Sequence, residues 1–158
     1  MLATELAALF ARDLQRLCQE LNAFPDDAAV WATAPGVTNS AGTLALHLEG
    51  NLREYVGRQL GGRAYVRERP AEFSTRNVPL ADLVARTTRL QADIPPVIGA
   101  LTMAALEAIY PEEVLGIPLT TRQFLVHLHG HLNYHLGQID CLRRVTTGAG
   151  ALALVGLG

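Results

Sequence analysis

The chain has no lysine: all thirteen of its basic residues are arginines, and these nearly balance fifteen acidic residues to leave a net charge of −2. Without lysine, Schiff-base chemistry on a side-chain amine is excluded. A net charge this small gives no general attraction to a phosphate backbone, so we expect no nucleic-acid partner.

Cysteines and long apolar runs are equally scarce. The only two cysteines, Cys18 and Cys141, fall in helical patterns and are interpreted as ordinary small buried groups, as is typical of a reducing compartment. No segment approaches the roughly 20 apolar residues that a membrane-spanning helix needs. The N-terminus also lacks a basic start followed by an apolar core. These absences predict a cytoplasmic protein with no membrane partner.

The chain is of single-domain length, and its apolar residues follow helical spacing. No stretch alternates polar and apolar residues for long enough to build a sheet. Helices are expected over about 2–21, from Asn39 or Ser40 onward, after Pro79, and over about 121–144. Pro95-Pro96 must end or kink the third of these near Ile94. Trp31, in the long loop before the second helix, is expected to have a structural role.

Four of the five histidines lie close together, in the run His127-Leu-His129-Gly-His131-Leu-Asn-Tyr-His135. Thr120 and Gln123 form a capping-box pattern, which predicts that the surrounding helix begins there. At about 100° per residue, His127, His131 and His135 share the apolar stripe and are expected to face the core. His129 lies well round the helix from them and is expected to face solvent.

Three buried neutral imidazoles need partners, because each unsatisfied polar group costs on the order of 1–3 kcal/mol. A divalent metal ion is one solution, since residues four apart on a helix lie about 6 Å apart and can converge on one ion. His127 and His135 are roughly 12 Å apart along the axis and cannot share it. The pair is therefore His127 with His131, or His131 with His135, unless ordinary hydrogen bonds satisfy all three.

A third ligand must come from another element. The fifth histidine, His47, lies at the edge of the apolar stripe of the second expected helix. It is a candidate ligand, and a partly exposed surface histidine is the alternative.

The string Leu125-Val-His127-Leu-His129-Gly-His131-Leu-Asn-Tyr-His135-Leu-Gly137-Gln138 closely resembles the last helix of the DinB-like superfamily of metal-dependent enzymes. Leu44-Ala-Leu-His47-Leu-Glu-Gly-Asn51-Leu-Arg53 resembles its second helix, and residues 62–73 resemble the connection that follows. The resemblance implies a single DinB-like domain over 1–158. Within it we expect an antiparallel four-helix bundle over about 2–144 and an apolar tail over 145–158.

The same resemblance implies that His47, His131 and His135 hold a divalent ion, with Zn or Ni favoured. It places His127 one turn above the site, where it would support a ligand or contact substrate. Three histidine ligands leave a tetrahedral ion one open position, which is typical of a catalytic site. The chain lacks the glutamate that follows the first histidine of HExxH peptidases, so peptidase chemistry is disfavoured.

The resemblance favours a metal-dependent transferase acting on a small molecule, with a low-molecular-weight thiol as one substrate, or a hydrolase. A non-catalytic metal-binding or stress-associated protein is the alternative. Glu54 is the candidate catalytic acid or base, with an ion pair to Arg58 as its alternative role. Six arginines between Arg53 and Arg76 form either an anion-binding rim or a solvated loop with local glutamate partners.

Small residues mark another side of the last helix. Gly130 and Gly137 lie one heptad apart there, together with Val126, Tyr134 and Cys141. They let a second helix approach closely, either from the same bundle or from another subunit. The resemblance to a family whose members are often dimeric favours a homodimer.

Overall fold

The computed structural model describes residues 2–153, and these form helices and no strand. The helices are α1 (Leu2–Asn22), α2 (Asp27–Trp31), α3 (Ala41–Leu52), the π-helix η1 (Arg53–Arg58), α4 (Arg69–Ser74), α5 (Leu80–Gly99), α6 (Met103–Glu107) and α7 (Thr121–Thr147). The all-α prediction is confirmed. Residues 154–158 of the expected apolar tail lie outside the described part. Among the described helices, none combines the length and apolarity needed to cross a membrane.

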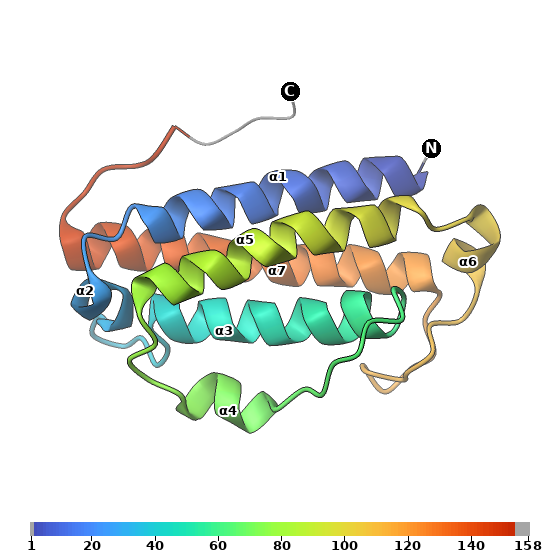
Figure 1. Ribbon diagram of the computed structural model, residues 1–158, viewed down its shortest axis with the longest axis horizontal. Helices are drawn as coiled ribbons and strands as arrows, with labels where there is room; N and C mark the ends of the chain where they lie inside the picture. The colour runs from blue at the N-terminus through green and yellow to red at the C-terminus, as the bar shows by residue number, and fades with distance from the viewer. Residues whose placement is uncertain (1, 154–158) are drawn as a thin grey trace.

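Four long segments form a bundle: α1, α3 continued by η1, α5 and α7 (Figure 1). α1 and α3 each pack against both α5 and α7, so α1 and α3 occupy diagonal corners. α1 and α7 run in one direction, and α3 and α5 run in the other. The antiparallel pairs are therefore α1 with α5 and α3 with α7. α3 and α5 are parallel neighbours because the connection through α4 returns the chain to the end where α3 began.

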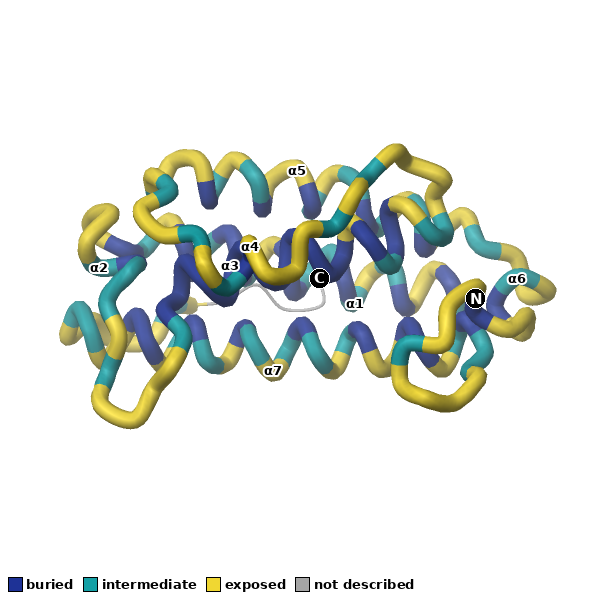
Figure 2. Tube along the Cα trace, turned by 90° about the horizontal axis from the view of Figure 1, so that it is seen from below, coloured by how far each residue is buried: buried dark blue, intermediate teal, exposed yellow. Residues whose placement is uncertain are grey.

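The core lies between the four long helices, whose buried positions face inward while the outer positions are exposed (Figure 2). Its largest fully buried apolar side chains come from α1, α3, α5, α6 and α7: Phe10, Leu14, Leu17, Leu21, Leu48, Leu52, Leu83, Ile94, Ile98, Leu106 and Phe124. This core fixes the distance between α3 and α7, the two helices that carry the histidines.

The helices that carry the histidines begin at capping residues. Ser40 accepts a hydrogen bond from the backbone N–H of Thr43 at the start of α3. Thr120 and Gln123 form the predicted capping box at the start of α7. α7 ends at Thr147 and is capped by Gly148, whose φ of 72° lies in the left-handed region that favours glycine.

In the connections the structure settles one open alternative and adds one element. α5 does not end at Pro95-Pro96 but continues to Gly99. The carbonyls that lose a helical hydrogen bond belong to Gln91 and Ala92, which are partly or fully exposed, so water can bond them. The loop before α3 also contains the short helix α2, which the sequence analysis missed.

Trp31, at the end of α2, has the structural contacts expected of it. Its indole N–H donates to the carbonyl of Val78 at 2.9 Å. Its ring packs so closely on Gly42 that a Cβ there would lie only 2.9 Å from it. Trp31 therefore ties α2 to the start of α3 and to the segment before α5.

Candidate metal centre

His47 of α3 and His131 and His135 of α7 face one another between the two helices. One ring nitrogen from each lies within 4.8 Å of the other two. Nε2 of His47 is 3.1 Å from Nε2 of His131, near the roughly 3.3 Å that separates two nitrogens bound at about 2.0–2.1 Å to a tetrahedral ion. Of the two pairs that helical spacing left open, the structure brings His131 and His135 together with His47.

Glu72 of α4 contacts the His47 ring nitrogen that faces away from His131. Its Oε2 lies 2.8 Å from Nδ1 of His47. Because an ionised carboxylate can only accept, His47 donates its Nδ1–H and its unprotonated Nε2 faces His131. Arg67 in turn donates to both oxygens of Glu72, at 2.7 and 3.0 Å. A carboxylate in this position orients a metal-binding histidine and raises its basicity.

Gly50 makes room for that carboxylate. It lies in α3 one turn after His47, and a Cβ at this position would come within 2.0 Å of Oε1 of Glu72. A glycine in the middle of a helix costs roughly 0.5–1 kcal/mol relative to alanine. The close approach of Glu72 to α3 explains why a glycine is required here.

His135 and His131 have different partners. Nδ1 of His135 donates to Oε1 of Gln138 at 2.7 Å, so its Nε2 keeps a free lone pair. Nδ1 of His131 is buried and has no hydrogen-bond partner in the described part of the chain. The partner of its Nε2 is the imidazole of His47. The unprotonated Nε2 atoms of His47 and His135 therefore lie beside Nε2 of His131, and a divalent ion fits this set of donors.

The protonation states suit a metal. Burial, followed by repulsion from His135 and His47, lowers the pKa of His131 to about 4. Burial also lowers the pKa of His135. For Glu72, burial raises the pKa, but hydrogen bonds from His47 and Arg67 outweigh it and hold the pKa below its usual value. Neutral His131 and His135 and an ionised Glu72 near pH 7 are the states that metal binding requires.

Three imidazoles accept several divalent ions, including Zn, Ni, Cu and Fe. They leave one position of a tetrahedral ion open for a substrate or water. Such a centre is able to bind and activate a nucleophile.

Two other candidate residues lie apart from the cluster. Glu54 is buried, and Nε of Arg58 donates to it at 2.8 Å, which is the alternative role considered for it. Among the described residues, no hydrogen bond joins Glu54 to the three histidines. His127 is exposed, so the expectation that it faces the core was wrong. Its ring stacks on Phe124, which fills the core side at this level.

His129 faces α1 rather than solvent, which corrects a second expectation. Its Nε2 lies 2.8 Å from Oδ2 of Asp13, and Asn133 donates to the same oxygen at 2.8 Å. Asp13 is fully buried in α1. The expectation failed because α7 packs against α1 as well as α3, so its buried arc is wider than the histidine stripe.

The six arginines between Arg53 and Arg76 all have partners within the described chain. Four of them form ion pairs: Arg53 with Glu49, Arg58 with Glu54, Arg63 with Asp93, and Arg67 with Glu72. Arg76 donates to backbone carbonyls, and Arg69 lies over the ring of Phe73. Five of the six thus have partners close by in the sequence, whereas the partner of Arg63 lies on α5.

Comparisons with known proteins agree with this geometry. The fold is similar to that of a DinB-like protein from Bacillus cereus ATCC 10987, with a TM-score of 0.66 and 18% identity over 89% of this chain and 91% of that one. It is also similar to a DinB-like protein from Bacillus subtilis, with a TM-score of 0.69 and 17% identity over 97% and 96% of the two chains. No curated protein is a significant match. The family model described as mycothiol-S-transferase matches residues 5–148. The chain therefore belongs to the mycothiol-S-transferase family, and it has the fold of DinB-like proteins.

Proposed function

We propose that the protein is a metal-dependent transferase that joins a low-molecular-weight thiol to a small electrophile. The observation that carries the proposal is the cluster of His47, His131 and His135, braced by Glu72, in a chain of the mycothiol-S-transferase family. The name of the family makes mycothiol the first thiol to test.

Each residue of the centre has a separate task in this proposal. His47, His131 and His135 hold a divalent ion, with Zn or Ni favoured. When bound, such an ion lowers the pKa of a thiol, so that the thiolate is available as a nucleophile at neutral pH. Glu72 and Gln138 keep the rings of His47 and His135 in position. The thiol loses its proton to solvent, its sulfur bonds to the electrophilic carbon, and the displaced electron pair leaves with the departing group.

His127 and Glu54 are assigned supporting roles. The exposed ring of His127 lies one turn before His131, where it can contact a substrate that enters from solvent. Glu54 stays the candidate acid or base, although Arg58 already occupies its carboxylate.

An apolar groove beside the centre suits the electrophile. It has a volume of about 600 Å³ and lies between residues 34–39, Leu44 and the C-terminal part of α7, including Gln138. Leu44 precedes His47 by about one helical turn, and Gln138 is hydrogen-bonded to His135. The groove therefore adjoins the metal centre, and its apolar lining fits an uncharged substrate body.

The test is conjugation of mycothiol to monobromobimane by protein loaded with Zn²⁺ or Ni²⁺. We expect a rate above that of the thiol alone, lost in His131→Ala and in metal-free protein. A loaded protein that gives no such rate contradicts the transferase proposal. If the same protein hydrolyses 4-nitrophenyl acetate instead, a hydrolase replaces it.

A non-catalytic metal-binding protein is the second candidate. The observation in its favour is that Glu54 is paired with Arg58 and Glu72 with Arg67, so neither carboxylate is free to act as a base. Protein substituted with Co²⁺ separates the two candidates. A change in its visible spectrum on addition of thiol shows an exchangeable position, whereas an unchanged spectrum supports a closed, bracing ion.

We propose a homodimer through the outer side of α7. Val126, Gly130, Tyr134, Gly137 and Cys141 are all exposed, so the expectation that Cys141 is buried was wrong. A Cβ at either glycine would meet nothing within 4 Å, so no helix of the described chain covers this side. Light scattering at micromolar concentration should give the mass of two chains, and Gly137→Glu should give one. A one-chain mass for the unmodified protein contradicts the proposal.

A further inference from the structure

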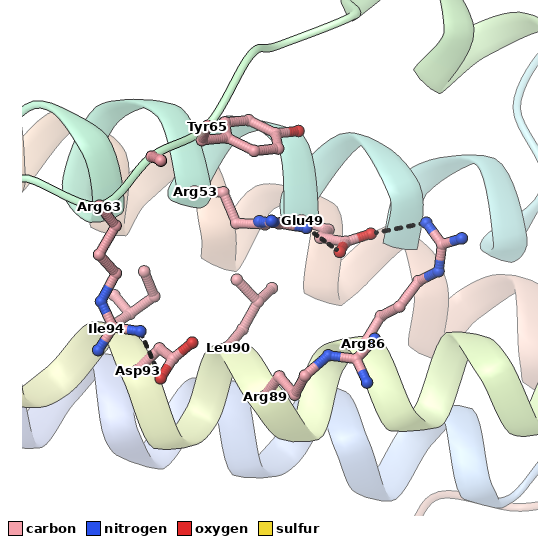
Figure 3. Close-up of a pocket in the computed structure, with 11 residues that line it drawn as sticks. Glu49, Arg53, Arg63, Tyr65, Arg86, Arg89, Leu90, Asp93 and Ile94 are labelled. Carbon is pink, nitrogen blue, oxygen red and sulfur yellow. Dashed lines mark hydrogen bonds and ion pairs between the residues drawn. The ribbon is translucent and has the colours of Figure 1, made fainter.

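A polar cleft lies on the opposite side of α3 from the metal centre. His47 and Glu49 project about 200° apart on this helix, so Glu49 faces α5 while His47 faces α7. The cleft lies between α3, α5 and the connecting segment that carries Arg63 and Tyr65 (Figure 3). Its volume is about 380 Å³.

Four guanidinium groups line this cleft against only two carboxylates. Arg53 and Arg86 both pair with Glu49, at 3.1 and 3.2 Å. Arg63 pairs with Asp93 at 2.7 Å. The fourth, Arg89, takes part in no ion pair within the described chain. The cleft therefore carries an excess of two positive charges, which favours an anionic ligand.

Two of the guanidiniums are held in place before any ligand arrives. Glu49 is only 6% exposed and accepts from Arg53, at the start of η1, and from Arg86 on α5, so it fixes both groups at the cleft wall. The guanidinium of Arg53 also lies 4.3 Å from the centre of the Tyr65 ring. Arg53 and Arg86 therefore form a fixed positively charged wall of the cleft, which adds to its attraction for an anion.

The other two guanidiniums are available. The Arg63–Asp93 pair is about half exposed on both sides, and exposed ion pairs contribute little, so a ligand can displace Asp93. Arg89 is exposed, and its guanidinium points toward Arg86 rather than toward Arg63 (Figure 3). Between them, Leu90 and Ile94 of α5 supply an apolar surface.

We propose that this cleft is a binding site, separate from the metal centre, for a small organic anion: a carboxylate or phosphate attached to an apolar body. The exposed side chains of Arg63 and Arg89 turn toward the anionic group and bind it, because guanidinium forks match carboxylate and phosphate oxygens. Leu90 and Ile94 contact the apolar body. The ligand would bridge α5 and the segment after η1.

The test is titration of the metal-loaded protein with benzoate, phenyl phosphate and the neutral analogue benzamide, followed by calorimetry and by backbone amide NMR. We expect saturable binding of one or both anions, and benzamide binding at least about tenfold more weakly. Arg63→Gln and Arg89→Gln should each weaken binding by about tenfold. Arg122→Gln is the matched control, because Arg122 is similarly exposed and paired, with Glu107, but lies outside the cleft.

The amide shifts locate the ligand. Changes centred on Tyr65 and Leu90 support the cleft, and the stronger of the two anions identifies carboxylate or phosphate as the preferred group. Changes centred on His131 and His135 would show that the anion binds the metal, and would overturn the proposal. Equal binding of benzamide, no saturable binding of either anion, or Arg63→Gln and Arg89→Gln variants that behave like Arg122→Gln would overturn it too.

Discussion

Replacing Gly50 with alanine tests whether the contact between Glu72 and His47 supports the metal centre. The added methyl would lie 2.0 Å from Oε1 of Glu72, whereas ordinary contact begins at 3.4 Å, so the carboxylate must retreat by about 1.4 Å. After that retreat it cannot keep its 2.8 Å hydrogen bond to Nδ1 of His47. Loss of such a partner lowers metal affinity by about 10–100-fold, or about 1.4–2.8 kcal/mol.

Although Gly50→Ala should weaken metal binding, it should stabilise helix α3 itself. Alanine in place of glycine stabilises a helix interior by up to about 1 kcal/mol. The free energy of unfolding of metal-free Gly50→Ala should therefore stay close to that of the unmodified protein while its metal affinity falls. This divergence separates damage to the site from a general folding defect.

The assay is the apparent dissociation constant for Zn²⁺, measured by competition with a chromogenic chelator, beside urea unfolding of the metal-free protein. Gly57→Ala is the matched control. It lies in the same helical run, and a methyl there is 3.9 Å from its nearest neighbour. Unchanged affinity in Gly50→Ala, with the control also unchanged, would refute the reasoning that Glu72 must touch His47.

Three further substitutions test other contacts. Burial raises the pKa of Asp13, but hydrogen bonds, chiefly from His129, outweigh it and hold the pKa well below the usual range. This contribution to stability is present above the unfolded-state pKa of about 4 and is lost as the pH falls below it. Asp13→Asn should lower the free energy of unfolding, measured with urea at pH 7, by about 1.5–3 kcal/mol. It should also reduce the loss of stability between about pH 5 and 3. An unchanged dependence of stability on pH contradicts this. Arg143→Met leaves buried Glu20 unpaired and should lower the free energy of unfolding by about 3–5 kcal/mol. Adding Glu20→Leu should restore most of this stability. A double variant as unstable as Arg143→Met contradicts this. Glu72→Gln should weaken Zn²⁺ binding at least about tenfold in the chelator assay, and unchanged affinity would remove Glu72 from the centre.

The elements that depend on local signals could be predicted from the sequence. Ser40, Thr120 and Gln123 cap their helices through contacts within a few residues, so the starts of α3 and α7 were visible. His131 and His135 lie on one helix face because they are four residues apart. His47 comes from another helix, and the resemblance to a family, rather than spacing, placed it with the pair.

Contacts between elements could not be predicted in the same way. Glu72 is 25 residues from His47 and comes from a short helix, so no periodic pattern joins them. A usable signal was Gly50, a glycine in the middle of a helical pattern, which indicates close approach by another group. Asp13 gave a comparable signal for His129, because a charged residue within an apolar stripe requires a buried partner.

The metal content of untagged protein, measured beside His47→Ala, His131→Ala and His135→Ala, tests the central claim most directly. The account predicts about one divalent ion per chain in the unmodified protein. It predicts loss of that ion in each of the three variants, with helical content retained by circular dichroism. Unmodified protein that holds no metal even after reconstitution would contradict the account, and retention of the ion in His47→Ala alone would assign the third ligand to another residue.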